Sequence, residues 1–484
     1  MLGGLYAQPL TLLTDLYQLT MAAAAWKSGV EGREAAFHLV FRRAPFRGGF
    51  TIAAGLASAI DYLREWRFSE DDLRYLGGLR ADSGEALFEP AFLDHLRRVE
   101  PRLDIDAVPE GTAVFPQEPL LRVSGPIVPC MLLETPLLAL INFQTLVATK
   151  AARVCLAAQG QPVLEFGLRR AQGADGAISA SRAAYIGGCA ATSNVLAGKL
   201  LGIPVRGTHA HSWVMIFESE PEAFEAYARA MPHNVVLLVD TYDSLEGVRH
   251  AIEIGRKLQA QGRKLAGIRL DSGDLAWLSI EARKLLDAAG FQGTGILASN
   301  ELDENVIESL KQQGAKITSW GVGTRLVTGA DDGALGGVYK LSAVRDSGGA
   351  WRPRIKLSEQ SAKVSVPGVL QVRRFRTGNE LAGDLIYDQA EQPSRTLVDM
   401  LDPTRRKTIP EAAAAEDLLV PAVRGGKPVY SFPPLNEIRA RTQAQLDLLH
   451  PGIKRFVNPH TYPVGLDPPL HDRRTRMILE ARER

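Results

Sequence analysis

Two histidines one residue apart, His209 and His211 in the stretch GTHAHSWVM, are the side chains of this sequence that first suggest chemistry. If the stretch is an extended strand, both side chains project from the same face. Such a pair could bind a metal ion, pack in the interior, or place one reactive imidazole beside a neighbour. A metal site needs further ligands at neighbouring strand ends. The other histidines do not fall at such ends, so the metal interpretation is the least favoured.

Polar or glycine-rich clusters end four apolar runs, which are VVLLVD (235–240), KLAGIRLD (264–271), TGILASN (294–300) and KITSWGVGT (316–324). Amphipathic helical segments separate these runs at intervals of roughly 25–30 residues, the spacing of βα units. The carboxyl ends of parallel strands face a common site. Asp, Ser and Asn at such ends could instead only cap the following helices. Four successive polar ends, one of them carrying Arg269, favour a site.

Anion-binding features accompany these strand ends. Arg169, Arg170 and Arg269 could each hold a carboxylate or phosphate through a forked pair of N–H groups. DSGD (271–274) opens a helix, where sugar hydroxyls or a magnesium–pyrophosphate complex would fit. GVGT (321–324) lets the backbone approach an anion closely. The segment SNVLAGKL is not a nucleotide-binding P-loop, because Ser193 and Leu200 occupy positions that require other residues.

The strand ends VLEFGLRR (163–170) and PVRGTHAH (204–211), on either side of a helical segment, extend the predicted barrel upstream. We therefore predict three regions, with a mixed N-terminal part at 1–130, a barrel at 131–340 and short strands joined by turns at 341–484. The alanine-rich segment 411–417 and the charged C-terminal end are expected at the surface.

Bulk composition excludes several classes of function. The chain has 56 Lys and Arg against 55 Asp and Glu, a net charge of +1, which gives no electrostatic case for nucleic acid or an anionic membrane. Three scattered cysteines predict free thiols in a reducing cytoplasm. No run reaches the roughly 18 apolar residues of a membrane helix. The sequence predicts a globular protein of two or more domains.

Several motifs occur in an order that resembles the nicotinate phosphoribosyltransferase family. From about residue 10 to beyond residue 370 they include TDLYQLTMA, FRRAPFRGGF, EFGLRRAQGADG, GTHAHSWV, GIRLDSGDLA, SNELDE, GVGTRLVT and LGGVYKLSA. The resemblance implies an irregular TIM-like α/β barrel with a second α+β domain built from both chain ends, as in type II phosphoribosyltransferases. It also implies synthesis of nicotinate mononucleotide from nicotinate and phosphoribosyl pyrophosphate, with ATP and Mg²⁺, by a homodimer with shared active sites.

The resemblance assigns roles to individual residues. His211 fills the position that ATP phosphorylates in the GTxAH motif, His209 falls at the variable position, and Asp271 faces the ribose or the magnesium–pyrophosphate. The nicotinate-binding residues would be Tyr17 (from the neighbouring subunit), Phe166, Thr208 and Arg269. The phosphoribosyl pyrophosphate-binding residues would be Arg169, Asp240, Asn300, Gly323 and Thr324.

One segment departs from the family pattern. Residues 187–194 read GGCAATSN where relatives carry GGFDGTSN or similar, so an aromatic residue and an acid near the site are lost. Ser193 and Asn194 without a nearby acid favour nicotinate over nicotinamide as the substrate. Three alternatives remain open from the residues. They are a nicotinamide or quinolinate transferase, a metal-dependent barrel hydrolase using His209 and His211, and an inactive relative that serves as a binding protein.

Overall fold

The computed structural model describes residues 9–360 and 363–483, and the chain divides into two compact units. Unit 1 combines residues up to Leu146 with Ala334–Pro434 and the residues from Gln443 onward. Unit 2 combines Val147–Gly333 with Leu435–Thr442. The sequence predicted an inserted region at 131–340. In the structure, the division falls inside the long helix α7 (Glu134–Ala158), because a continuous helix offers no break in pattern that would reveal a boundary.

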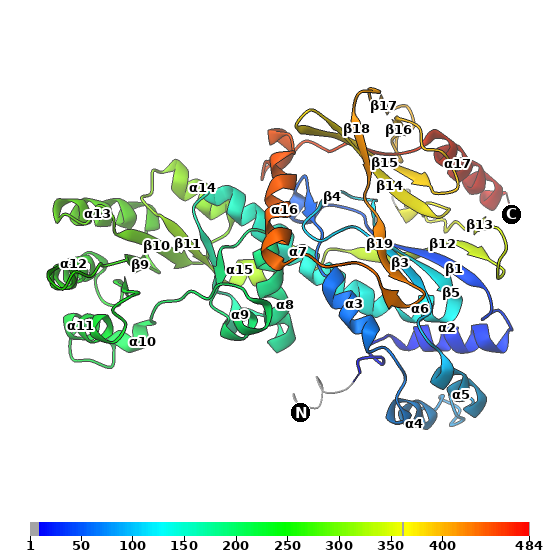
Figure 1. The fold of residues 1–484 in the computed structure, drawn as a ribbon, viewed down its shortest axis with the longest axis horizontal. Coiled ribbons are helices and arrows are strands. Elements are labelled where there is room, and N and C mark those ends of the chain that lie inside the picture. The colour runs from blue at the N-terminus through cyan, green and yellow to red at the C-terminus, as the bar shows by residue number, and fades with distance from the viewer. Residues whose placement is uncertain (1–8, 361–362, 484) are drawn as a thin grey trace. The chain divides into compact units, whose positions relative to one another are not determined.

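Unit 2 contains a six-stranded parallel sheet in the order β7-β6-β11-β10-β9-β8 (Figure 1). Its strands are β6 (Val163–Glu165), β7 (Ala191–Thr192), β8 (Val236–Leu238), β9 (Gly267–Leu270), β10 (Gly295–Asn300) and β11 (Ser319–Val322). The strands are short and mostly buried, as expected where helices cover a parallel sheet. All four runs predicted between residues 235 and 324 form strands of this sheet.

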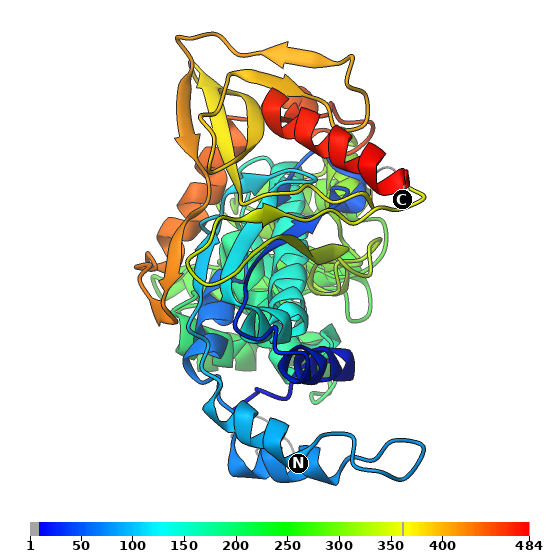
Figure 2. The same ribbon diagram turned by 90° about the vertical axis from the view of Figure 1, so that its right-hand side faces the viewer.

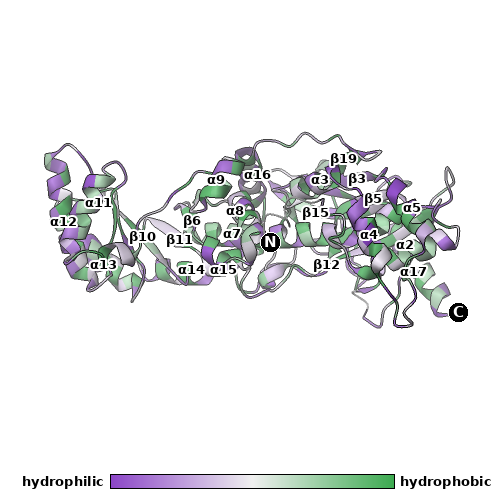
Figure 3. Ribbon diagram, turned by 90° about the horizontal axis from the view of Figure 1, so that it is seen from below, coloured by the Kyte–Doolittle hydropathy of each residue, from purple (hydrophilic) through white to green (hydrophobic). Residues whose placement is uncertain are grey.

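The helices of unit 2 begin where the alternating pattern places them. They are α8 (Gly173–Ile186), α9 (Val195–Leu201), α10 (His211–Val214), α11 (Glu220–Ala230), α12 (Ser244–Ala260), α13 (Leu275–Ala288), α14 (Glu304–Gln312) and α15 (Thr324–Val327). Asp243, Asp274 and Asp303 cap α12, α13 and α14 by accepting backbone N–H bonds. Hydrophobic and hydrophilic residues alternate along α12 (Figure 3), whose apolar residues are buried. The capping interpretation therefore holds for these three aspartates but not for every polar residue at the strand ends.

An irregular segment completes the barrel between the two edge strands, β7 and β8. Val205 forms a parallel bridge with Thr192 of β7. On the other side, the N–H of Leu238 in β8 donates to Nε2 of His209 at 3.1 Å. The predicted strand at 204–211 is wrong beyond Val205, because the chain then loops and enters helix α10 at His211. A histidine side chain replaces the backbone ladder at this point of the barrel wall.

Unit 1 is built on an antiparallel sheet in the order β13-β12-β1-β5-β3-β19-β20. Strands from the early (blue and cyan) and late (yellow to orange) parts of the chain are visible in Figure 2. Strand β1 (Glu34–Phe41) pairs with β5 (Pro119–Pro126) on one side and with β12 (Gly337–Arg345) on the other. The remaining strands are β3 (Asp104–Ala107), β13 (Arg352–Pro353), β19 (Val420–Arg424) and β20 (Lys427–Pro428). Segments from both ends of the chain thus share one sheet, as the family resemblance implies.

A second sheet of unit 1 has the order β17-β16-β21-β15-β14-β18. Its strands are β14 (Leu370–Thr377), β15 (Glu380–Asp388), β16 (Thr396–Val398), β17 (Arg406–Thr408), β18 (Ala414–Asp417) and β21 (Val464–Leu466), and a small pair is formed by β2 (Thr51–Ile52) and β4 (Ala113–Val114). The alanine-rich segment is largely exposed, as predicted, and also supplies the edge strand β18. The side chains of β18 are exposed, so this strand pairs with β14 through its backbone without burying them.

The helices of unit 1 are α2 (Leu16–Lys27), α3 (Leu56–Arg64), α4 (Glu70–Gly78), α5 (Pro90–Arg98), α6 (Ile127–Leu132) and α17 (Pro468–Arg482), while α16 (Leu435–Asp447) begins in unit 2 and ends in unit 1. Most described residues of the charged C-terminal end are exposed or half-buried, as predicted. Two exceptions are His471 and Arg474, which α17 buries.

A charged cluster is buried in unit 1. Arg374 is only 1% exposed and donates to both carboxylate oxygens of Asp384, with Nη2 2.5 Å from Oδ2. Tyr462 donates its hydroxyl to the same carboxylate at 2.8 Å. Burial, together with the nearby charge of Asp384, raises the pKa of Glu118 well above its ordinary value. Glu118 is therefore held neutral, and the cluster contains one compensated ion pair.

The segment Ile127–Ala158, formed by α6 and α7, has the length and hydropathy of a membrane-spanning helix. The expectation that no run of the chain reaches this length is therefore wrong. However, 61% of its most apolar window is buried inside the protein, which is typical of a core helix.

Candidate active site

Arg269 is the centre of a polar cluster at the carboxyl end of the parallel sheet. Its Nη2 donates to Asp271 Oδ1 at 2.6 Å, and its Nη1 donates to Thr208 Oγ1 at 3.1 Å. Its Nε donates to Ser299 Oγ at 2.7 Å. The guanidinium carbon also lies 5.8 Å from the centroid of the Phe166 ring. Four residues predicted for the site, at positions 166, 208, 269 and 271, are thus brought together.

The Phe166 ring packs over Gly321 of β11. A side-chain carbon at position 321 would lie 2.7 Å from this ring, so glycine is required for the close approach. The ring is half-buried and flanks the guanidinium of Arg269. An aromatic face beside a cation is suited to a flat ligand that bears a negative charge.

His211 lies at the start of α10, with its side chain 39% exposed. Its Nδ1 hydrogen-bonds with Thr241 Oγ1 at 3.2 Å, and its Nε2 lies 3.8 Å from Asp271 Oδ2. Burial would raise the pKa of Asp271, but a hydrogen bond from Ser299 and the charge of Arg269 outweigh it and hold this pKa below its ordinary value. His211 is therefore an accessible imidazole beside a carboxylate that stays ionised.

His209 has a different environment from His211. It is buried, its Nε2 accepts the Leu238 N–H, and its Nδ1 lies 3.3 Å from the carbonyl oxygen of Ala210. Its ring lies against Tyr227, with the centroids 4.7 Å apart. Burial lowers the pKa of His209, so the ring is neutral, with its proton on Nδ1. Both ring nitrogens are engaged, and the expectation of two histidines on one strand face is wrong.

Searched across residues 9–360 and 363–483, the structure contains no group of three or more His, Cys, Asp or Glu side chains placed to hold a metal ion. With the Nε2 of His209 already occupied by Leu238, the two histidines do not form a metal clamp.

Asp240, at the end of β8, links the neighbouring strand ends. Its Oδ2 accepts the N–H of Asp271 at 2.7 Å and the hydroxyl of Ser272 at 2.8 Å. Its Oδ1 is buried and has no hydrogen-bond partner within the described part of the chain. A buried carboxylate oxygen without a partner is costly unless a ligand satisfies it, and a hard cation is one such ligand.

The other predicted residues lie at the rim of unit 2 without joining the Arg269 cluster. Arg169 is exposed and forms no hydrogen bond or ion pair with the residues that the structure describes. Asn300 ends β10 with a φ of 125°, and Gly323 precedes α15. Thr324 donates to Glu301 Oε1 at 3.3 Å.

Tyr17 belongs to unit 1, on α2, and is 48% exposed. Partial burial and the charge of Glu134 raise its pKa. An aromatic side chain left half-exposed on a helix is available for a contact beyond its own helix.

Two functional candidates were missed by the sequence analysis. Ser299 stands beside the predicted Asn300 but points into the cluster, where it contacts both Arg269 and Asp271. Glu165, next to Phe166, is buried and accepts hydrogen bonds from Ser181 at 2.9 Å and Thr192 at 2.5 Å. Glu165 could have been recognised from the sequence as an acidic residue at the end of an apolar strand.

The GGCAATSN segment forms a satisfied network despite its departure from the family pattern. Asn194 caps α9 and donates to Ser181 Oγ at 3.2 Å, and Thr192 bonds Glu165. Cys189 is buried in the same segment. The small residues of this segment therefore do not disturb the hydrogen bonds of Glu165, the residue before Phe166.

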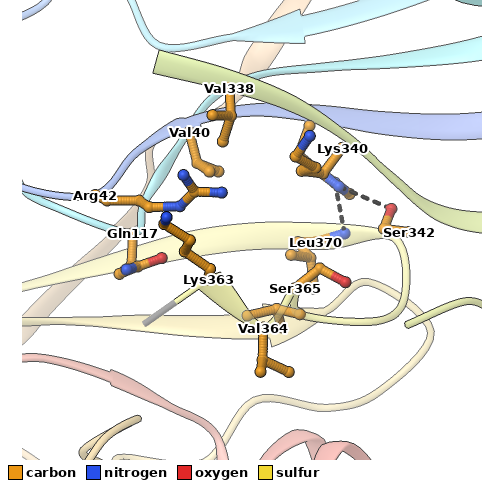
Figure 4. Close-up of a pocket in the computed structure, with 12 residues that line it drawn as sticks. Val40, Arg42, Gln117, Val338, Lys340, Ser342, Lys363, Val364, Ser365 and Leu370 are labelled. Atoms are coloured by element: carbon orange, nitrogen blue, oxygen red, sulfur yellow. Dashed lines mark hydrogen bonds between the residues drawn. The ribbon is translucent and has the colours of Figure 1, made fainter. Parts of the chain in front are cut away.

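A separate pocket in unit 1 is lined by cations (Figure 4). His38 accepts the N–H of Leu370 at 3.1 Å and hydrogen-bonds with Ser342 at 2.8 Å. Arg42, Lys340 and Lys363 line the pocket and have no ion pair with the described residues. The pocket is therefore suited to an anionic group.

Comparison with known proteins indicates the same family as the sequence motifs. The nicotinate phosphoribosyltransferase N-terminal domain matches residues 12–142, the family's central region matches 162–363, and its C-terminal domain matches 371–474. The chain is 40% identical to nicotinate phosphoribosyltransferase of Bacillus subtilis, covering 99% of this chain and 98% of the relative. It is 36% identical to the rat protein of the same name over 97% and 96% of the two chains.

Solved structures agree with this assignment. The crystal structure of human nicotinic acid phosphoribosyltransferase matches with a TM-score of 0.84 and 34% identity, over 96% of this chain and 99% of that one. A nicotinate-nucleotide pyrophosphorylase from Pyrococcus furiosus, at 22% identity and a TM-score of 0.67, shares the fold. The predicted fold class, an α/β barrel with an α+β domain, is confirmed. With three matched regions and relatives similar along nearly its whole length, the chain belongs to the nicotinate phosphoribosyltransferase family.

Proposed function

We propose that this enzyme transfers the phosphoribosyl group of phosphoribosyl pyrophosphate to nicotinate, forming nicotinate mononucleotide and pyrophosphate in NAD biosynthesis. One observation carries this proposal. Arg269 keeps one N–H on each terminal nitrogen free of partners among the described residues, and it lies beside the ring of Phe166. A carboxylate on a flat pyridine ring matches this combination.

The reaction is a substitution at the anomeric carbon of the ribose. The pyridine nitrogen forms the new bond as the bond to pyrophosphate breaks, and positive charge develops on the sugar. Positioning and charge stabilisation suffice for such a step. Asp271, held ionised, is placed to stabilise this charge or to bind the ribose hydroxyls.

A magnesium ion fits the residues of the site. Asp240 offers a buried oxygen without a partner, and Asp271 lies next to it. Magnesium, when bound there with the pyrophosphate, would neutralise charge on the leaving group. We assign Arg169, Asn300, Gly323 and Thr324 to the phosphate and ribose side.

ATP coupling would proceed through His211. An imidazole nitrogen of His211 attacks the γ-phosphorus of ATP, the N–P bond forms, and the P–O bond to ADP breaks. Exposure of the ring and its fixed Nδ1 contact with Thr241 support this role. His209 is excluded by its buried, fully engaged ring.

Incubation with ATP is expected to place one acid-labile phosphate on His211. Mass spectrometry of the digested protein maps the label, and His211→Ala should lose both the label and the stimulation by ATP while keeping part of the basal transfer. His250→Ala, another partly exposed histidine of unit 2 that bonds Glu220, is the matched control. A phosphate on His209, or an undiminished label in His211→Ala, contradicts the assignment.

We also assign Tyr17 to the nicotinate ring bound by the partner subunit, which makes the active enzyme a homodimer. Mixing Tyr17→Ala chains with Arg269→Ala chains tests this. Each heterodimer then contains one intact site and one doubly damaged site. Random reassortment should restore about a quarter of the parent activity, since half the dimers are mixed. No recovery after proven subunit exchange would show that Tyr17 serves its own chain.

An assay of phosphoribosyl transfer to different acceptors tests whether nicotinate is the substrate. Nicotinate, nicotinamide and quinolinate should be compared side by side, with and without ATP. Preference for nicotinamide or quinolinate would overturn the proposed substrate. The three free cysteines support a reducing cytoplasm as its location.

A further inference from the structure

Ser299 lies between the two charged groups at the centre of the site. It is the last but one residue of β10 and is buried. Its hydroxyl accepts from Nε of Arg269 at 2.7 Å and donates to Oδ1 of Asp271. A hydroxyl can do both at once, because it carries one donor and two acceptor positions.

The contacts of Ser299 decide which N–H groups of Arg269 remain for a ligand. A guanidinium has five N–H groups, one on Nε and two on each terminal nitrogen. Ser299 takes that of Nε, Thr208 takes one on Nη1, and Asp271 takes one on Nη2. One N–H on each terminal nitrogen is left for a ligand, and we call these two N–H groups the terminal fork.

We propose that Ser299 is a positioning residue that keeps the terminal fork of Arg269 directed at the substrate carboxylate. Without the Ser299 hydroxyl, Nε and Nη2 would both turn to Asp271 and form a bidentate pair, which is the preferred arginine–carboxylate geometry. That rotation withdraws the fork from the ligand. The role rests on the proposed transfer to nicotinate.

Packing explains why a small residue with a hydroxyl stands here. A side-chain carbon placed on Gly321 would lie 3.3 Å from Cβ of Ser299, and the Phe166 ring occupies the same space. A larger residue at 299 would displace the ring that flanks Arg269. Alanine is small enough to fit, so Ser299→Ala removes the hydroxyl without displacing the ring.

Ser299→Ala is expected to raise the KM for nicotinate about 10-fold and to leave the KM for phosphoribosyl pyrophosphate within about 2-fold. Initial rates with each substrate varied in turn measure the two KM values. The split between them is the effect that a merely structural serine would not produce.

Ser279→Ala is the matched control, because Ser279 is a buried serine of unit 2 whose hydroxyl, among the described residues, bonds Ala276 and Lys316 and not the site. It should change neither KM. Ser299→Cys keeps the shape but offers a weak donor and acceptor, and should behave like Ser299→Ala if the alanine variant folds poorly.

A double-variant comparison completes the test. In an Arg269→Ala background, Ser299→Ala should raise the KM for nicotinate no further. An unchanged KM for nicotinate, an equal loss for both substrates, or a full effect without Arg269 would each overturn the role of Ser299. If the parent enzyme does not use nicotinate, the proposed function fails instead.

Discussion

Replacing Arg269 with alanine is expected to raise the KM for nicotinate by about 10- to 150-fold, the value of a charge-assisted hydrogen-bonded pair. The binding of phosphoribosyl pyrophosphate should change far less, because the guanidinium of Arg269 lies beside the Phe166 ring, where the flat base is proposed to bind. Initial rates with each substrate varied in turn measure the two effects. Nicotinamide, which has no carboxylate, should be a poor substrate and nearly indifferent to the change.

Arg283 supplies the matched control for Arg269. Both side chains are 16% exposed and lie in unit 2, but Arg283 bonds Asp287 and the carbonyl groups of Thr294 and Phe291. Arg283→Ala should alter stability without discriminating between the substrates. An equal loss for both substrates in Arg269→Ala would mean that Arg269 binds phosphate or only supports the barrel.

Arg374→Ala is expected to lower the free energy of unfolding of unit 1 by about 3–5 kcal/mol, since it leaves the buried carboxylate of Asp384 without its counter-charge. Glu118 cannot compensate, because it is itself an acid whose pKa is raised by burial and by Asp384. Denaturant unfolding followed by circular dichroism measures the loss.

Removing both partners provides the control. Arg374→Met combined with Asp384→Leu leaves no buried charge and should recover much of the stability. A single Arg374→Ala variant as stable as the parent would show that water or movement relieves Asp384. A double variant less stable than Arg374→Ala would instead assign the stability to packing.

Local patterns predicted the parts of the fold that depend on nearby residues. Alternating strands and helices between residues 235 and 324 were readable because their periodicity is local. The polar strand ends indicated a common site that includes Arg269 and Asp271, and the family motif added Thr208, which contacts Arg269 in the structure. The family motifs, which span most of the chain, supplied the rest of the assignment.

Features that depend on distant partners could not be predicted in this way. His209 acts through the N–H of Leu238, which lies 29 positions further along the chain. The contact of Ser299 with Arg269 could not be predicted, because it depends on the pairing of β10 with β9. Position 204–211 was misjudged because a side chain, rather than a backbone ladder, closes the barrel there.

The position of unit 2 within the sequence of unit 1 sets an order of events during synthesis. Strand β1 finds β5 early, but its other partner, β12, lies beyond the segment Val147–Gly333. At about 5–20 residues per second, a ribosome needs roughly 10–40 s to make that segment. Throughout this interval, one edge of the largely apolar β1 remains open to pairing with other nascent chains. We therefore expect the soluble yield to depend on how well the open edge of β1 is shielded until β12 leaves the ribosome.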